Sequence, residues 1–199
     1  IKPTIDISAD NEFAFRNACK NGHLHVAQWL YQTKPTIDIS VYYEEAFCNA
    51  CCYGHLHVAQ WLYQTKPTIN ISACDEFAFR YACSNGHLEV VQWLYQTKPT
   101  IDISAVHEFA FRYACCHGYF HIVKWLYQIK PTIDISVDDE YTFRFACENG
   151  HLQVAQWLYR TKPMIDISAN NEYAFCNACF NGHLEVVKWL YQINPMINV

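Results

Sequence analysis

The sequence predicts an all-α repeat protein, a solenoid of six stacked antiparallel helix pairs with extended or hairpin connectors and a concave groove. Three observations predict this fold class: an unbroken 32-residue period, a change from alternating to helical periodicity inside each repeat, and a fixed apolar stripe. The six glycines of the 199-residue chain lie 32 residues apart, and so do the six tryptophans. Self-similarity at a period of this size is the signature of stacked structural repeats.

The period covers the whole chain without an insertion, so we expect a single array. Its repeats are residues 1–32, 33–64, 65–96, 97–128, 129–160 and 161–192, and residues 193–199 begin a seventh. Neither end carries the polar capping repeat that a solenoid needs for solubility. We therefore expect the chain to be a fragment of a longer protein.

Each repeat begins with a connector of alternating apolar and polar residues, such as Lys2 to Ser8. Proline at the second position, Pro3 in the first copy, disfavours a helix, and the alternation favours an extended segment. Ser8 recurs in all six copies and is the expected N-cap of the helix that follows.

Two helices are expected after the connector. From about residue 10 to 21 the apolar spacing becomes helical, and Gly22 is suited to end that helix. A second helix is expected from about Leu24 to Gln32. This second segment is apolar around most of its circumference, so it must pack against neighbouring repeats on both sides.

Comparison of the six copies separates a fixed face from a variable one. Phe15, Ala18, Cys19 and Gly22 follow the i, i+3, i+4, i+7 spacing of a buried stripe and do not vary. Variation is confined to the opposite side of the first helix and to the connector tips, at the repeat positions of Asp10, Asn11, Phe13, Asn17 and Lys20.

Charge and composition exclude several function classes. A net charge of −5 argues against a protein that binds a phosphate backbone, so no nucleic-acid partner is expected. The recurring lysines have Asp6 and its copies nearby, which predicts a mixed, solvated loop edge. No apolar run approaches the ~20 residues that span a bilayer, so no membrane partner is expected. The 52% hydrophobic content is incompatible with a disordered tail.

The eleven cysteines indicate buried thiols in a reducing intracellular compartment. Six of them recur at the position of Cys19, where stacked helices ~8–10 Å apart are too distant for disulfides. Cys48 and Cys52 form the one i, i+4 pair, but neighbouring repeats offer no further good ligands, so no metal site is expected. Together with Cys176, they are expected to be exposed, oxidisable thiols.

The histidines and carboxylates are expected to be structural. Five of the ten histidines follow the repeat glycine, as His23 does, and are expected to brace adjacent loops. No Ser or Cys nucleophile recurs beside them, so neither a catalytic centre nor a cofactor is expected. Glu12 recurs in every copy, and Arg16 or its counterpart follows four residues later in four of them. That order favours an ion pair within the helix.

The repeat resembles ankyrin repeats over all 199 residues. The family's A-A, G-H, V-V, L-L and V-N positions correspond to Ala18-Cys19, Gly22-His23, Val26-Ala27, Leu30-Tyr31 and Ile5-Asp6. The family's T-P-L-H is replaced by Phe13-Ala14-Phe15-Arg16, its hairpin G-A by Lys2-Pro3, and the period is one residue shorter than 33. These departures leave the shape of the hairpin tip open. The copies also look like the divergent ankyrin arrays of large DNA viruses of amoebae, which implies the cytoplasm of an infected host cell.

The resemblance implies a protein-binding scaffold whose groove is formed by the first helices and hairpin tips. These are the positions that vary here, and their Tyr and Arg content is typical of interface hot spots. The expected recognition residues are Tyr42, Tyr43, Glu45, Arg80, Tyr81, His107, Arg112, Tyr113, His117, Arg144 and Phe145.

Four alternatives remain open from the sequence. The aromatic residues at the position of Asn17 could only fill gaps between neighbouring helices. The array could be a structural spacer without a specific ligand, or the substrate-recognition arm of a ubiquitin-ligase adaptor. Exposed core faces at the two ends could also lead to end-to-end self-association.

Overall fold

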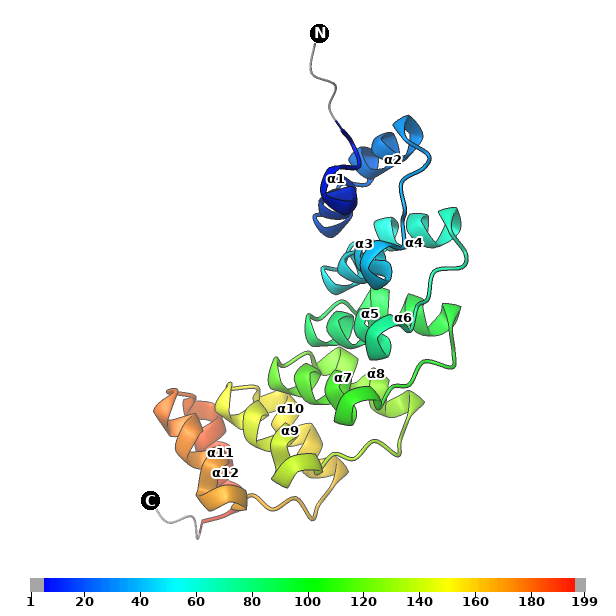
Figure 1. Cartoon of the computed structure of the whole chain (residues 1–199). Helices are drawn as coiled ribbons and strands as arrows, with labels where there is room; N and C mark the ends of the chain where they lie inside the picture. The colour runs from blue at the N-terminus through cyan, green and yellow to red at the C-terminus, as the bar shows by residue number, and fades with distance from the viewer. Residues whose placement is uncertain (1–5, 196–199) are drawn as a thin grey trace. The chain divides into compact units, whose positions relative to one another are not determined.

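The computed structural model describes residues 6–195, and within that range the chain has twelve α-helices and no strand (Figure 1). The all-α repeat fold is therefore confirmed. Each 32-residue repeat contributes two helices, and the chain divides into two compact units, Ile1–Asp102 and Ile103–Val199.

The first unit contains three helix pairs. Their bounds are α1 Ala9–Lys20, α2 Leu24–Thr33, α3 Val41–Cys52, α4 Leu56–Thr65, α5 Ala73–Ser84 and α6 Leu88–Thr97. The first helices α1, α3 and α5 pack successively side by side, and each also packs against the second helix of its own repeat.

The second unit repeats this arrangement. Its helices are α7 Ala105–Cys116, α8 Phe120–Ile129, α9 Val137–Glu148, α10 Leu152–Thr161, α11 Ala169–Phe180 and α12 Leu184–Ile193. Here α7, α9 and α11 pack successively, and the helices agree to within about a residue with those expected from the repeat pattern.

The fixed apolar residues form the core, as predicted. Phe15 and Cys19 are fully buried on α1. The Trp61 ring lies 6.1 Å from the ring of Phe15 and 6.0 Å from that of Tyr31, both in the preceding repeat. Trp93, Trp157 and Trp189 make equivalent contacts, so within each unit a recurring tryptophan fastens a second helix to the preceding repeat, which explains why its sequence is almost constant.

The connectors differ from the extended segments that the alternation predicts. The N–H of Ile37 donates to the carbonyl of Lys34 at 3.1 Å, which closes a turn around Pro35. A second turn follows, in which the N–H of Ser40 donates to the carboxylate of Asp38 at 3.0 Å. Proline preorganises the first turn, and the aspartate side chain favours the second. The connector from Lys2 to Ile5 lies outside the described residues.

The recurring serine precedes each first helix but does not cap it. The Ser72 hydroxyl donates at 2.6 Å to the carboxylate of Glu76, and no described serine at this position accepts a bond from a first-turn N–H. The residues after it adopt positive φ angles, for example Cys74 at 52°. The first-turn N–H groups are therefore not presented to the serine as they are at a regular helix start.

Candidate protein-binding surface

A left-handed turn opens the first helix of every repeat. In the second repeat the φ angles of Tyr42, Tyr43 and Glu44 are 53°, 56° and 66°. Such a conformation costs roughly 1–2 kcal/mol for each non-glycine residue, so surrounding contacts must hold it in place. The turn buries Glu44 and leaves Tyr43 80% exposed. It therefore displays two variable positions of each repeat to solvent.

An arginine of the same helix holds this turn in three repeats. Arg80 Nε donates to the carbonyl of Asp75 at 2.6 Å, and its terminal nitrogen donates to the carbonyl of Cys74 at 3.1 Å. Arg144 makes the equivalent bonds in the fifth repeat, and Arg16 in the first. Arg80 and Arg144, both expected as recognition residues, are only 8% exposed and support the turn from beneath.

The recurring glutamate does not form the expected ion pair with Arg16, Arg112 or Arg144 four residues later. Glu44 and Glu76 accept instead from backbone N–H groups of the following connector, Asn70 and Asp102, at 3.3 Å each. Because the glutamate has positive φ, it does not share a helical face with the residue four positions later. Glu44 and Glu76 thus link α3 and α5 to the connector that follows their repeat.

Aromatic side chains cover the exposed side of the first helices in the second unit. Phe109 stacks on Tyr113, and Tyr141 on Phe145, each with ring centroids 4.2 Å apart. Phe145 also lies 5.7 Å from the ring of Tyr173 in the next repeat. We call these five residues the aromatic band. Its members are half-buried, so they pack on one another and still present ring surface to solvent.

Two arginines connect the aromatic band across repeats. The guanidinium of Arg112 lies 4.7 Å from the centroid of Tyr141 and donates to the carboxylate of Asp138 at 2.5 Å. The Arg144 guanidinium lies 4.9 Å from the centroid of Tyr173. Burial is the main cause that raises the pKa of Tyr141 to about 12. The aromatic band is therefore a rigid surface rather than a set of loose side chains.

The first unit has a related arrangement. Phe77 stacks on Tyr81 at 4.2 Å. Arg16 forms an ion pair with Glu45 of the next repeat and lies 4.9 Å from the ring centroid of Tyr42. Two residues expected at the recognition surface, Tyr42 and Glu45, thus share one neighbour that the sequence analysis did not select.

The eleven expected residues differ in their degree of burial. Tyr42, Tyr43, His107 and His117 are exposed, Glu45, Tyr81, Arg112, Tyr113 and Phe145 are half-buried, and Arg80 and Arg144 are buried. Six contributors were not expected from the sequence, namely Arg16, Phe77, Phe109, Asp138, Tyr141 and Tyr173. The sequence could have identified the aromatic residues among them, because they recur at the repeat position of Phe13. It could also have identified the ion pair, because Arg112 and Asp138 have opposite charges and lie 26 residues apart in neighbouring repeats.

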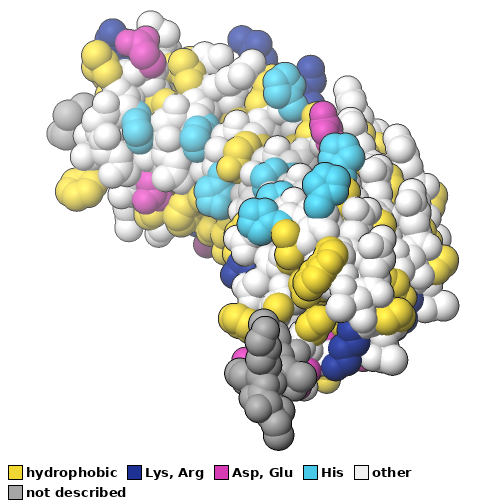
Figure 2. Space-filling model, turned by 90° about the horizontal axis from the view of Figure 1, so that it is seen from above, with side chains coloured by type: hydrophobic (Ala, Val, Ile, Leu, Met, Phe, Trp, Pro, Cys, Tyr) yellow, Lys and Arg dark blue, Asp and Glu magenta, His cyan; other side chains and the backbone are white. Residues whose placement is uncertain are grey.

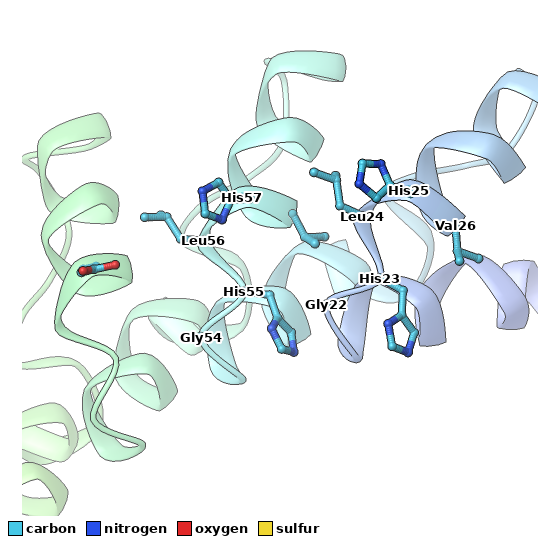
Figure 3. A pocket seen from close by; sticks show the side chains of 11 residues that line it. Gly22, His23, Leu24, His25, Val26, Gly54, His55, Leu56 and His57 are labelled. Carbon is cyan, nitrogen blue, oxygen red and sulfur yellow. The ribbon is translucent and has the colours of Figure 1, made fainter.

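The recurring histidines brace adjacent loops, as expected. A side chain on Gly22 would place its Cβ 2.5 Å from Nδ1 of His55, so the imidazole packs directly on that glycine (Figure 3). His87 donates to the carbonyl of Cys52 at the end of α3, and burial lowers its pKa. Asn85 donates to the same carbonyl at 2.9 Å. These side chains cap the first helix of the preceding repeat.

Further histidines line a shallow groove in the first unit, about 580 Å³ in volume. Figure 3 shows the rings of His23 and His55 pointing the same way, with His25 and His57 on the opposite side of the groove. Histidine side chains reach the molecular surface, as Figure 2 shows. Among the described residues, no group of three His, Cys, Asp or Glu side chains is arranged to hold a metal ion.

The cysteines are mostly buried, and one expectation about them is wrong. Cys48 and Cys52, expected to be exposed thiols, are buried on α3, whereas Cys176 is exposed as expected. The Cys48 thiol donates to the carbonyl of Tyr43 at 3.9 Å, and burial raises its pKa to about 12. It occupies the place that arginine takes in other repeats. Of the six recurring cysteines, Cys179 is the exception in being exposed.

No helix in the described part of the chain is long and apolar enough to cross a membrane. A family model described as ankyrin repeats, in three copies, matches residues 48–139 and again 111–199. No curated protein matches the sequence. The crystal structure of the human ASB11 ankyrin repeat domain is similar, with a TM-score of 0.67 at 15% sequence identity. That match covers 90% of this chain and 83% of the other, and it shows the fold. Since the family model spans well over half of the sequence, the chain belongs to the ankyrin-repeat family.

Proposed function

We propose that the chain is a non-enzymatic scaffold that binds a partner protein through its first helices and left-handed turns. Ankyrin repeats generally mediate protein–protein interaction. One observation carries the proposal for this surface. The repeat positions of Asp10 and Asn11 vary among the six copies and are exposed at every turn, while the core is repeated almost without change.

The energetics of the turn support this function. A left-handed turn of three non-glycine residues is costly, yet it recurs six times and is held by arginine, glutamate and serine side chains. A surface fixed in this way loses little conformational entropy when a partner binds. Tyr43 supplies a large exposed contact area. Tyr81 and Tyr113, which stack on Phe77 and Phe109, add rigid aromatic area.

Two alternative functions make different demands on this surface. A structural spacer has no use for an 80% exposed tyrosine at a strained turn. A substrate-recognition arm of a ubiquitin-ligase adaptor would use the same surface to bind its substrate. Its further partners would be components of the ligase. Capture of ligase components together with a substrate would favour that second function.

Self-association is a separate proposal, and the exposure of one tryptophan favours it. Inside the array Trp61 covers Phe15 and Tyr31, whereas the equivalent Trp29 is 59% exposed. At the other end, Phe175 and Tyr191 occupy the positions equivalent to Phe15 and Tyr31. Trp29 of a second copy would fit there as Trp61, Trp93, Trp157 and Trp189 fit the preceding repeat.

The proposed surface is tested by affinity capture from a cell lysate, with the bound proteins identified by mass spectrometry. The intact chain is compared with the variant Tyr43→Ala/Tyr81→Ala/Tyr113→Ala. A control variant, Gln32→Ala/Gln64→Ala/Gln96→Ala, changes exposed residues of the second helices instead. A partner lost only from the tyrosine variant supports the proposal. The same partners on all three proteins would contradict it.

A further inference from the structure

We propose that the partner docks a basic segment, containing Lys or Arg beside apolar residues, on the aromatic band of the second unit. This inference rests on the proposed function and specifies the chemistry of its partner. Its starting observation is the distribution of charge around Phe109, Tyr113, Tyr141, Phe145 and Tyr173.

Exposed charges in the second unit are largely separated by sign, and among the described residues the exception is Glu185, an exposed carboxylate on α12 that pairs with Lys188. The exposed cations are all on second helices, namely Lys124, Arg160 and Lys188. The connectors and left-handed turns carry exposed carboxylates instead, namely Asp134, Asp138, Asp139 and Asp166. Asp138 and Asp139 immediately precede the part of α9 that bears Tyr141. The aromatic band is therefore bordered by negative charge.

The cations nearest the aromatic band are already engaged. Arg112 is paired with Asp138, and Arg144 is buried with its donors on two backbone carbonyls. Lys130 and Lys162 donate to the hydroxyls of Ser104 and Ser136. These hydroxyls in turn donate to buried or half-buried glutamates. Among the described residues, Asp134, Asp139 and Asp166 form no ion pair, so their charge remains to attract a cation.

Two of these carboxylates share a pocket next to the aromatic band. The pocket has a volume of about 440 Å³ and is lined by Ser136, Asp139, Glu140, Asp166, Ala169 and Asn170. It lies between the turn that opens α9 and the connector that leads to α11. The end of a lysine or arginine side chain fits both the charge and the polar lining of this pocket.

The aromatic band and the carboxylates favour the same class of ligand. Aromatic ring faces attract ammonium and guanidinium groups, and carboxylates accept charge-assisted hydrogen bonds from them. Apolar residues of the same segment would cover the remaining ring surface of Tyr113 and Phe145. Acidic segments and nucleic acids would instead be repelled by the bordering charge.

The test uses the intact chain to select binders from a library of short random peptides, followed by affinity measurements on the best synthetic peptide. The variant Asp139→Asn/Asp166→Asn removes two charges with little change of shape. The array itself contains asparagine at both equivalent positions, Asn171 and Asn70. Asn70 even makes the same turn, accepting from the N–H of Ser72 at 3.1 Å. The matched control Glu89→Gln/Glu185→Gln removes two exposed carboxylates from second helices.

We expect selected peptides to be enriched in Lys or Arg together with apolar residues. Their affinity should fall about tenfold for the aspartate variant, stay unchanged for the control and weaken with added salt. Peptides without basic enrichment that are lost on Tyr113→Ala/Phe145→Ala would overturn this inference and leave the proposed surface intact. Peptides indifferent to both sets of substitutions would contradict both proposals. A library that yields no binder would overturn the docking of a short basic segment.

Discussion

Arg144 Nε donates to the carbonyl oxygen of Asp139 at 2.6 Å, so one arginine holds a strained turn five residues before it. Replacing Arg144 with Met leaves this carbonyl and that of Asp138 without their donor. We expect a loss of about 2 kcal/mol in the free energy of unfolding, measured by urea titration. Arg160→Met on the exposed side of α10 is the control and should cost less than about 0.5 kcal/mol. Equal effects of the two substitutions would show that the turn does not depend on Arg144.

The glycine that ends each first helix offers a matched pair of substitutions. Gly22 and Gly182 have nearly equal φ angles, 74° and 75°. An added Cβ on Gly22 would meet His55 Nδ1 at 2.5 Å, whereas nothing lies within 4 Å at Gly182. Alanine at either position incurs the left-handed penalty of roughly 1 kcal/mol.

Gly22→Ala should be the more destabilising of the two because His55 must also move. Comparing urea midpoints of the two variants isolates the cost of displacing that histidine. If Gly182→Ala were equally destabilising, packing of His55 on Gly22 would contribute nothing measurable.

Acid should weaken the array through its bracing histidines. Burial is the main cause that lowers the pKa of His87 and His151, so the unfolded chain binds protons more readily than the folded one. Their contribution to stability is therefore complete above the ordinary histidine pKa of about 6.5 and declines as pH falls below it. Unfolding free energies measured by urea titration at neutral and mildly acidic pH should show this decline.

The variant His87→Tyr/His151→Tyr is the comparison, since the array itself has Tyr119 at the equivalent position of its fourth repeat. The pH dependence should become shallower in that variant. An unchanged slope would assign the effect to other titrating groups.

The repeat pattern was sufficient to predict the helices and the core, because burial of Phe15 and its copies follows directly from helical spacing. It was not sufficient for the turn. Three successive residues with positive φ, such as Val106, His107 and Glu108, contain no glycine or asparagine that would have indicated a left-handed turn. The positions of Glu12 and Arg16 were therefore interpreted as one helical face, and Arg80 and Arg144 were expected at the surface. Of the variable positions, those of Asp10 and Asn11 are exposed in every repeat, whereas Cys52 and Ser84 at the position of Lys20 are buried.

Thiol reactivity should follow burial rather than cysteine spacing. Cys74 and Cys176 are exposed, so they should react rapidly with an alkylating reagent in the native state. Burial raises the pKa of Cys51 and Cys83 well above the ordinary thiol value, which leaves almost no thiolate to react. Mass spectrometry of peptides after timed alkylation measures each site. Rapid modification of Cys51 without denaturant would show that the core opens locally.

Self-association should depend on Trp29. This residue belongs to the face that would meet Phe175 and Tyr191 of another copy, so Trp29→Ser removes the central contact of the proposed stack. Because the two faces differ, such contacts join copies head to tail and produce open-ended assemblies whose size grows with concentration. Light scattering over a concentration series should show this growth for the intact chain and a constant monomer mass for Trp29→Ser. Tyr43→Ser removes an exposed aromatic ring from a turn instead and should leave the growth unchanged. A monomeric intact chain would contradict the stacking proposal and leave the partner-binding surface as a separate question.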